Sequence, residues 1–127
     1  MTESFYEWSE KTILIVEDDI YNSKLLMRTL SATKANCLIA ENGMSAIDLY
    51  KKSPKIDIVL MDIQLPDING YDVTKKIIEI NPDAKVIAQT AYASLEDKDK
   101  CLHAGCCDFI IKPIEKDVFL STINKFI

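Results

Sequence analysis

Hydrophobic residues occur along this chain in short runs that alternate with longer segments of helical periodicity. Each run is rich in Ile, Val or Leu and ends at a polar residue, a pattern typical of strands that are covered on both faces. The predicted strands cover residues 12–16, 36–40, 56–61, 85–89 and 108–111.

Between these runs, apolar residues recur every three or four positions, which predicts helices. The predicted helices cover residues 21–32, 43–53, 70–81, 94–104 and 115–127. Asn42 is expected to cap the second helix, Val73, Ile77 and Ile80 to share one face of the third, and Gly105 to end the fourth. Strands that alternate with helices in this way predict an α/β fold: a five-stranded parallel sheet with five helices on both faces.

The first ten residues do not fit the alternation. Residues 1–10 are mostly polar, and we interpret them as a linker or a terminal edge, with the domain at 11–127. Phe5, Tyr6 and Trp8 leave a second interpretation open, in which these aromatic side chains dock on a folded domain.

Composition limits the classes of function. A chain of 127 residues with 48% apolar and 28% charged residues is expected to form one globular domain. No apolar run reaches the length of a membrane span, and no basic segment typical of a signal peptide opens the chain, so we expect a cytoplasmic protein with no direct membrane contact. The net charge of -5 argues against nucleic acid as a direct partner.

The four cysteines are expected to be reduced thiols that serve as small apolar residues. Cys101, His103, Cys106 and Cys107 could in principle bind zinc. Their order, C-x-H-x2-C-C, lacks the paired spacing of a zinc site, so we expect no metal there and a surface position for His103.

Side chains that could react or bind a metal lie at the ends of the predicted strands. Glu17 and Asp18 follow the first strand, Asp62 the third, Thr90 the fourth and Lys112 the fifth. A single aspartate at a strand end usually caps a turn. However, the carboxyl ends of parallel strands meet at one edge, and three clustered acids there call for a cation such as Mg²⁺. A carboxylate nucleophile, a metal and a lysine together suit phosphoryl transfer.

Five sequence motifs resemble the receiver domain of bacterial-type response regulators: ILIVEDD at 13–19, LMDIQLP at 60–66, NG at 69–70, QTA at 89–91 and KP at 112–113. The resemblance covers residues 11–127 and implies a flavodoxin-like sheet with the strand order 2-1-3-4-5. The QTAYA run at 89–93 and the lead-in at 8–11 resemble the receivers of hybrid sensor histidine kinases.

The resemblance also implies a role for each site residue. Asp62 would be the phosphoacceptor; Glu17, Asp18, Asp62 and the backbone carbonyl of Gln64 would hold Mg²⁺. Thr90 would be the switch hydroxyl, Lys112 the phosphate-binding lysine and Phe109 the switch aromatic. Gln64 and Tyr92 would tune the lifetime of the phosphoryl group, and a cis peptide would precede Pro113. Glu17 stands where many members have aspartate, and Phe109 where tyrosine is frequent.

The function implied is that of a phosphorelay receiver. It would accept a phosphoryl group from a phosphohistidine of a histidine kinase or a histidine phosphotransfer protein, and would then remodel the surface of its fourth helix, fifth strand and fifth helix. We expect no enzymatic activity beyond its own phosphorylation and dephosphorylation.

Three alternative functions fit the sequence less well. A degenerate receiver that acts only as a docking module would lack one of the five site positions, and all are filled. An aspartate-nucleophile phosphatase would need a further acid near Asp62. A flavin- or nucleotide-binding domain would need a glycine-rich phosphate loop, whereas Gly43, Gly70 and Gly105 are the only glycines.

Overall fold

The structure is a computed structural model, and it describes residues 6–53, 55–91 and 94–127. The strands are β1 (Thr12–Val16), β2 (Asn36–Ala40), β3 (Ile58–Asp62), β4 (Val86–Thr90) and β5 (Asp108–Ile111). The helices are α1 (Ile20–Ser31), α2 (Gly43–Lys52), α3 (Gly70–Ile80), α4 (Leu95–Ala104) and α5 (Lys116–Asn124). The alternation predicted from the sequence is confirmed.

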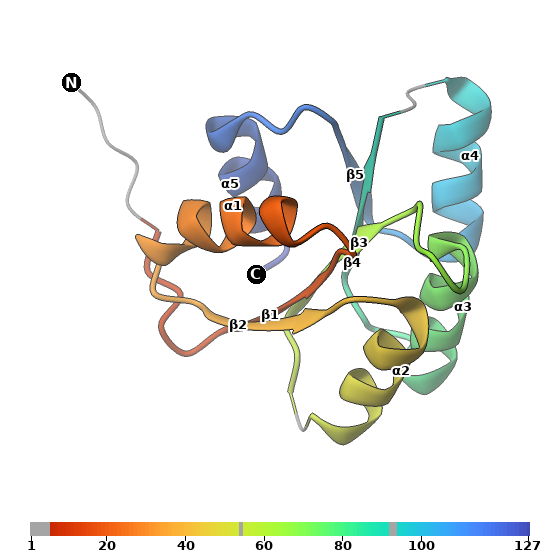
Figure 1. Cartoon of the computed structure of the whole chain (residues 1–127), viewed down its shortest axis with the longest axis horizontal. Coiled ribbons are helices and arrows are strands. Elements are labelled where there is room, and N and C mark those ends of the chain that lie inside the picture. The colour runs from red at the N-terminus through yellow and green to blue at the C-terminus, as the bar shows by residue number, and fades with distance from the viewer. Residues whose placement is uncertain (1–5, 54, 92–93) are drawn as a thin grey trace.

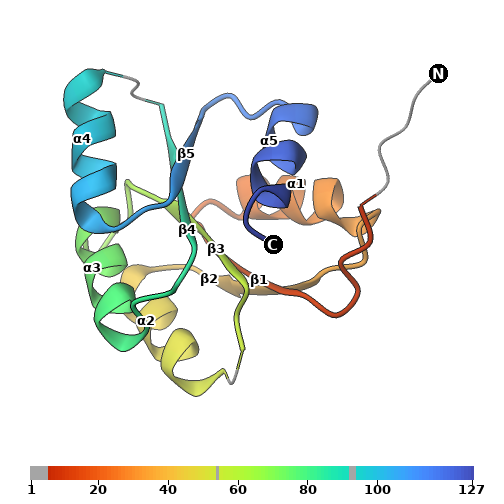
Figure 2. The ribbon, with the colours of Figure 1, turned by 180° about the vertical axis from the view of Figure 1, so that it is seen from behind.

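The strands form one parallel sheet in the order β2-β1-β3-β4-β5, as the resemblance implied. Helices α1 and α5 cover one face, and α2, α3 and α4 cover the other (Figure 1). The opposite view shows the same division of the helices about the sheet (Figure 2). The chain therefore brings the carboxyl ends of β1, β3, β4 and β5 to a common edge.

The sheet separates two hydrophobic cores. Leu14 and Val16 of β1 pack towards α2 and α3, whereas Ile13 and Ile15 pack towards α1 and α5. Because side chains alternate between the faces of a strand and both faces are covered, the central strands must be apolar throughout. All five residues of β3 are buried, and the last of them is Asp62.

Trp8 departs from the linker interpretation of the N-terminal residues. Its side chain is 5% exposed and belongs to the core beneath α1 and α5, and Tyr6 stacks on its ring. The backbone N–H of Trp8 donates to the carbonyl oxygen of Thr33 at 2.7 Å. A large aromatic side chain gains enough from burial to order the backbone that carries it, so the docking interpretation describes residues 6–8. Phe5 lies outside the described residues.

The other differences are local. Val73 and Ile77 are buried, whereas Ile80, the last residue of α3, is 40% exposed. Gly105 ends α4 with a φ of 108°, as expected of a glycine C-cap. The Lys112–Pro113 peptide is cis, which confirms the expectation from the family.

Two further features concern the cysteines and the lengths of the helices. Cys101 and Cys106 are buried free thiols and His103 is exposed, and they form no metal-ligand cluster within the part of the chain that the structure describes. No helix among the described residues is long and apolar enough to cross a membrane.

Candidate functional site

Three carboxylates meet at the carboxyl edge of the sheet. Glu17 and Asp18 follow β1 directly, and Asp62 ends the neighbouring strand β3. One carboxylate oxygen from each residue lies within 4.8 Å of the others. Glu17 and Asp62 are only 2% and 5% exposed, whereas Asp18 is exposed to solvent.

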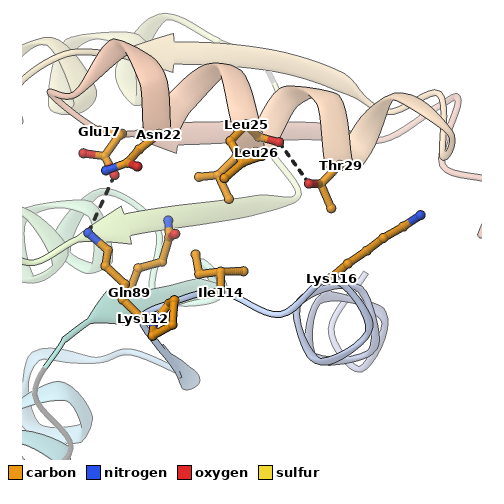
Figure 3. A pocket seen from close by; sticks show the side chains of 10 residues that line it. Glu17, Asn22, Leu25, Leu26, Thr29, Gln89, Lys112, Ile114 and Lys116 are labelled. Atoms are coloured by element: carbon orange, nitrogen blue, oxygen red, sulfur yellow. Dashed lines mark hydrogen bonds and ion pairs between the residues drawn. The ribbon is translucent and has the colours of Figure 1, made fainter.

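Lys112 supplies the counter-charge to this cluster. Its Nζ lies 3.7 Å from Oε1 of Glu17 (Figure 3). The same Nζ lies 3.4 Å from Oδ1 of Asp62. The residue follows β5, and its backbone N–H donates to the carbonyl oxygen of Thr90 at 2.7 Å. This hydrogen bond continues the pairing of β4 with β5 beyond the last strand residue, and so it fixes where the lysine side chain starts.

The backbone around Asp62 is held by close packing. The N–H of Gln64 donates to Oδ1 of Asp62 at 3.0 Å, which orients the carboxylate. Gly70, the first residue of α3, donates its N–H to the carbonyl oxygen of Ile63. A Cβ at Gly70 would lie 2.5 Å from the carbonyl oxygen of Asp62 and 2.6 Å from the Cα of Ile63. Only glycine allows α3 to begin so close to the strand end that carries Asp62.

Asp67 anchors the loop between β3 and α3, a role that the sequence did not reveal. Its carboxylate accepts hydrogen bonds from the N–H groups of Gly43 (2.8 Å) and Met44 (3.0 Å) at the start of α2. The bonds from Met44 and Gly43 lower the pKa of Asp67 below its usual value. Asn42 caps the same helix end from within, by accepting from the N–H of Ser45. The loop beyond Asp62 is thereby tied to a second helix.

Glu17 is a buried acid at this edge. Burial first, and then the neighbouring Asp62 carboxylate, raise the pKa of Glu17 to about 7. The N–H of Asp19 and the charge of Lys112 act in the opposite direction. Oε1 of Glu17 is buried and has no hydrogen-bond partner among the described residues, although Lys112 is near it. A buried carboxylate oxygen without a donor, in a cluster of acids, fits the oxygen ligands that a small divalent cation requires.

Residues 13–124 match the family model of the response regulator receiver domain. The chain belongs to this family.

Curated relatives of this receiver include both long and short proteins. It is 35% identical over 118 residues to hybrid signal transduction histidine kinase H of Dictyostelium discoideum, where the match covers 89% of this chain and 9% of the relative. It is 35% identical over 119 residues to the polar-differentiation response regulator DivK of Brucella anthropi, where the match covers 92% of this chain and 96% of the relative. The receiver therefore spans a small part of one relative and almost all of the other.

Solved receiver structures share the fold. One is in the co-crystal structure of the Saccharomyces cerevisiae histidine phosphotransfer signaling protein Ypd1 and the receiver domain of its downstream response regulator Ssk1, with 27% identity, a TM-score of 0.87, and coverage of 98% of this chain and 91% of that chain. Another is the receiver domain of sensor histidine kinase PA1611 from Pseudomonas aeruginosa, with a magnesium ion coordinated in its active site cleft; the identity is 27%, the TM-score 0.84, and the coverage 91% and 96%.

The remaining predicted site residues lie around this receiver's acidic edge at different depths. Thr90 is buried at the end of β4, one residue beyond Gln89, which pairs with Asp62. Phe109 lies further back on β5, half-buried, with Nζ of Lys98 at 5.2 Å from the centre of its ring. Gln64 is exposed, and Tyr92 lies outside the described residues. The structure thus brings Glu17, Asp18, Asp62 and Lys112 into one cluster, with Thr90 on the next strand.

Proposed function

We propose that this receiver takes a phosphoryl group from a phosphohistidine onto Asp62. Phosphorylation then changes the conformation of a surface formed by α4, β5 and α5. One observation carries the proposal: the carboxylate of Asp62 lies in a set of two further acids and a lysine, with Nζ of Lys112 at 3.4 Å. As a receiver domain of two-component phosphorelay systems, the chain has a nucleophile and a counter-charge at the same strand edge.

In the proposed transfer, a carboxylate oxygen of Asp62 attacks the phosphorus of the phosphohistidine. A P–O bond to Asp62 forms while the P–N bond breaks, and the electron pair of that bond stays on the imidazole nitrogen, which then takes a proton. Lys112 is placed to neutralise charge on the phosphoryl oxygens as they arrive. The N–H of Gln64 keeps the Asp62 side chain oriented during the attack.

We propose that Glu17, Asp18, Asp62 and the backbone carbonyl of Gln64 hold Mg²⁺. Mg²⁺, when bound, supplies positive charge that offsets repulsion between the acids and the phosphoryl group. Asp18 is the exposed member of the cluster, so it is the acid that incoming ions reach first. The longer side chain of Glu17, compared with the aspartate of many relatives, comes from the adjacent strand and reaches the same cluster.

A partner that delivers the phosphoryl group must reach this edge. The first turns of α1 follow the acids directly, and they present three exposed apolar side chains, Ile20 (56%), Tyr21 (81%) and Leu25 (57%). An exposed apolar patch beside a reactive group is typical of a protein interface. We propose that a histidine phosphotransfer protein or a histidine kinase docks there; a histidine phosphotransfer protein and a receiver domain form the Ypd1–Ssk1 co-crystal structure.

After phosphorylation, Thr90 and Lys112 are proposed to move towards the phosphoryl oxygens and Phe109 to turn inwards. A local change in charge would thereby bias a two-state surface. Gln64 and Tyr92 are proposed to control how long the phosphoryl group lasts, by governing the approach of one water molecule.

Incubation with acetyl phosphate and Mg²⁺, followed by intact mass spectrometry, tests this function. We expect one added phosphoryl group on the wild-type chain and on Asp117→Asn, a control that changes an exposed acid on α5, and none on Asp62→Asn. Full labelling of Asp62→Asn would refute the assignment. Steady release of phosphate with no labelled protein would favour the phosphatase alternative instead, and no labelling of any variant would favour the docking module.

A further inference from the structure

A cavity of about 350 Å³ lies beside the acidic edge, between α1 and the segment that follows β5 (Figure 3). Leu25, Leu26 and Thr29 of α1 line one side, and Ile114 and Gln89 line the other. Its volume is at the lower end of the range that small-molecule sites occupy. Asp62 is not among its lining residues.

Gln89 is the unusual member of this lining. Its side chain is 0% exposed, and neither Nε2 nor Oε1 has a hydrogen-bond partner among the described residues. Burying an amide without a partner is costly, so a residue kept in this state needs an explanation. In Figure 3 the amide points away from β4 towards α1, into the space that the cavity occupies.

The chemistry of the lining defines what would fit. A carboxamide presents a donor and an acceptor side by side, so its complement is a group with an adjacent acceptor and donor. The leucine and isoleucine side chains favour an apolar, planar body between them. Of the three charged lining residues, Lys112 and Glu17 face each other at 3.7 Å and offset each other's charge, and Lys116 extends away from Gln89 and Ile114 in Figure 3. The lining therefore gives little advantage to a charged ligand.

We propose that this cavity binds a small, uncharged, planar heterocycle with an adjacent donor and acceptor, such as a lactam or a pyrimidinone, through paired hydrogen bonds to the amide of Gln89. This site is separate from the phosphoacceptor, and its occupation does not depend on the function proposed for Asp62.

Lys112 connects the two places. Its side chain lines the cavity, and its Nζ is 3.4 Å from Asp62. A bound heterocycle limits the room in which the lysine side chain moves, so occupation of the cavity alters the rate at which Asp62 is phosphorylated. This second step rests on the proposed function, whereas binding does not.

The test is an NMR titration of the isotope-labelled full chain with quinazolinone, a fused-ring lactam, at millimolar concentration and without any phosphodonor. We expect saturable shifts at the backbone amides of Leu25, Leu26, Gln89 and Ile114. The N-methyl derivative of the probe lacks the donor and should bind about tenfold more weakly, the worth of one well-placed hydrogen bond.

Two variants sharpen the test. Gln89→Met keeps the length of the side chain but removes its hydrogen-bonding pair, and we expect it to lose at least the same factor in affinity. Lys116→Gln changes a lining residue that the uncharged probe does not use, so its affinity should stay at the wild-type value. If Gln89→Met does not fold, the comparison of the two probes on the wild-type chain decides the matter.

The absence of saturable shifts at the cavity, equal binding by Gln89→Met, or equal binding of the methylated probe would overturn the proposal. The coupling is tested separately, by measuring labelling with acetyl phosphate at saturating probe. An unchanged rate would overturn the coupling alone. Loss of labelling in all samples, with normal probe binding, would count against the function proposed for Asp62 and leave the binding site standing.

Discussion

At the scale of single residues, Glu17 combines a structural cost with a functional position. Its carboxylate is buried next to Asp62, and its pKa is raised to about 7. A raised pKa in the folded state means that this acid favours folding most below its ordinary value of 4.5, and that the benefit is lost as the pH rises through about 7. The site therefore trades stability of the metal-free protein for a ligand that a cation can use.

This shift predicts a pH dependence of stability in EDTA. The wild-type receiver should lose stability between pH 5 and pH 8 relative to Glu17→Gln, by an amount on the order of 3 kcal/mol, because the variant carries no charge to desolvate. Urea unfolding at both pH values measures the difference. The same pH dependence in the wild type and the variant would contradict the role of Glu17.

At Gly70, contact with neighbouring backbone atoms leaves no room for a side chain. Since a Cβ would lie 2.5 Å from the carbonyl oxygen of Asp62, Gly70→Ala must push α3 or the end of β3 aside. We expect a loss of about 2 kcal/mol in the free energy of unfolding, together with slower labelling by acetyl phosphate. Gly105→Ala is the matched control, because its Cβ would meet the side chain of Ile78 at 2.7 Å, at the end of α4 and away from the loop that follows Asp62. Equal labelling rates for both variants would argue against this role of Gly70.

At the scale of elements, the loop between β3 and α3 is held by α2, a helix that is not adjacent to this loop in the sequence. The carboxylate of Asp67 accepts hydrogen bonds from the first N–H groups of α2, where a negative charge is favourable. Because those hydrogen bonds lower its pKa, the stabilisation is present above the ordinary value of 3.8 and is lost as the pH falls through the folded-state pKa.

Asp67→Ala is therefore expected to destabilise the receiver at neutral pH and to slow labelling of Asp62, because the loop that orients the Asp62 carboxylate loses its anchor. Asn42→Ala removes the other cap of α2 and should cost about 1 kcal/mol without slowing the labelling. Thermal unfolding and labelling kinetics on both variants make the comparison. A similar effect of both on the labelling rate would show that only helix stability matters.

The elements themselves were predictable, because periodicity reports which face of a helix or strand is buried. All ten were predicted, and the ends of strands and helices differ from the prediction by a few residues. The contact of Asp67 with Gly43 was not, because the two residues are 24 positions apart and neither sequence context signals the other. The burial of Trp8 and the unpaired amide of Gln89 also depend on how α1 and α5 pack on the sheet, which no local pattern records.

The site was predictable for a different reason. Residues at the ends of parallel strands share an edge whatever the helices do, so Glu17, Asp18, Asp62 and Lys112 were expected to meet, and they do. What the sequence lacked was their degree of burial. Glu17 and Asp62 are almost inaccessible, whereas Asp18 is open to solvent, and no local sequence pattern distinguishes the three acids in this respect.

At the scale of the whole molecule, Lys112 is the link between the acidic edge and the elements on either side of β5. In Lys112→Ala we expect weaker labelling of Asp62 and much smaller NMR shift changes across α4 on phosphorylation, because no side chain draws the end of β5 towards the phosphoryl group. Comparing phosphorylated and unphosphorylated spectra of the wild type and the variant measures this. Shift changes of equal size in both would show that the signal travels another way.

Trp8 has a practical consequence for anyone who divides longer relatives into domains. The family match starts at residue 13, yet the only tryptophan of the chain is packed under α1 and α5 before that point. A recombinant fragment that is cut at the family boundary would lack one buried side chain of this core, at a cost of about 3 kcal/mol for the lost indole, and would be prone to aggregate. A fragment that begins before Tyr6 would keep the buried Trp8 side chain, whose fluorescence would report on folding.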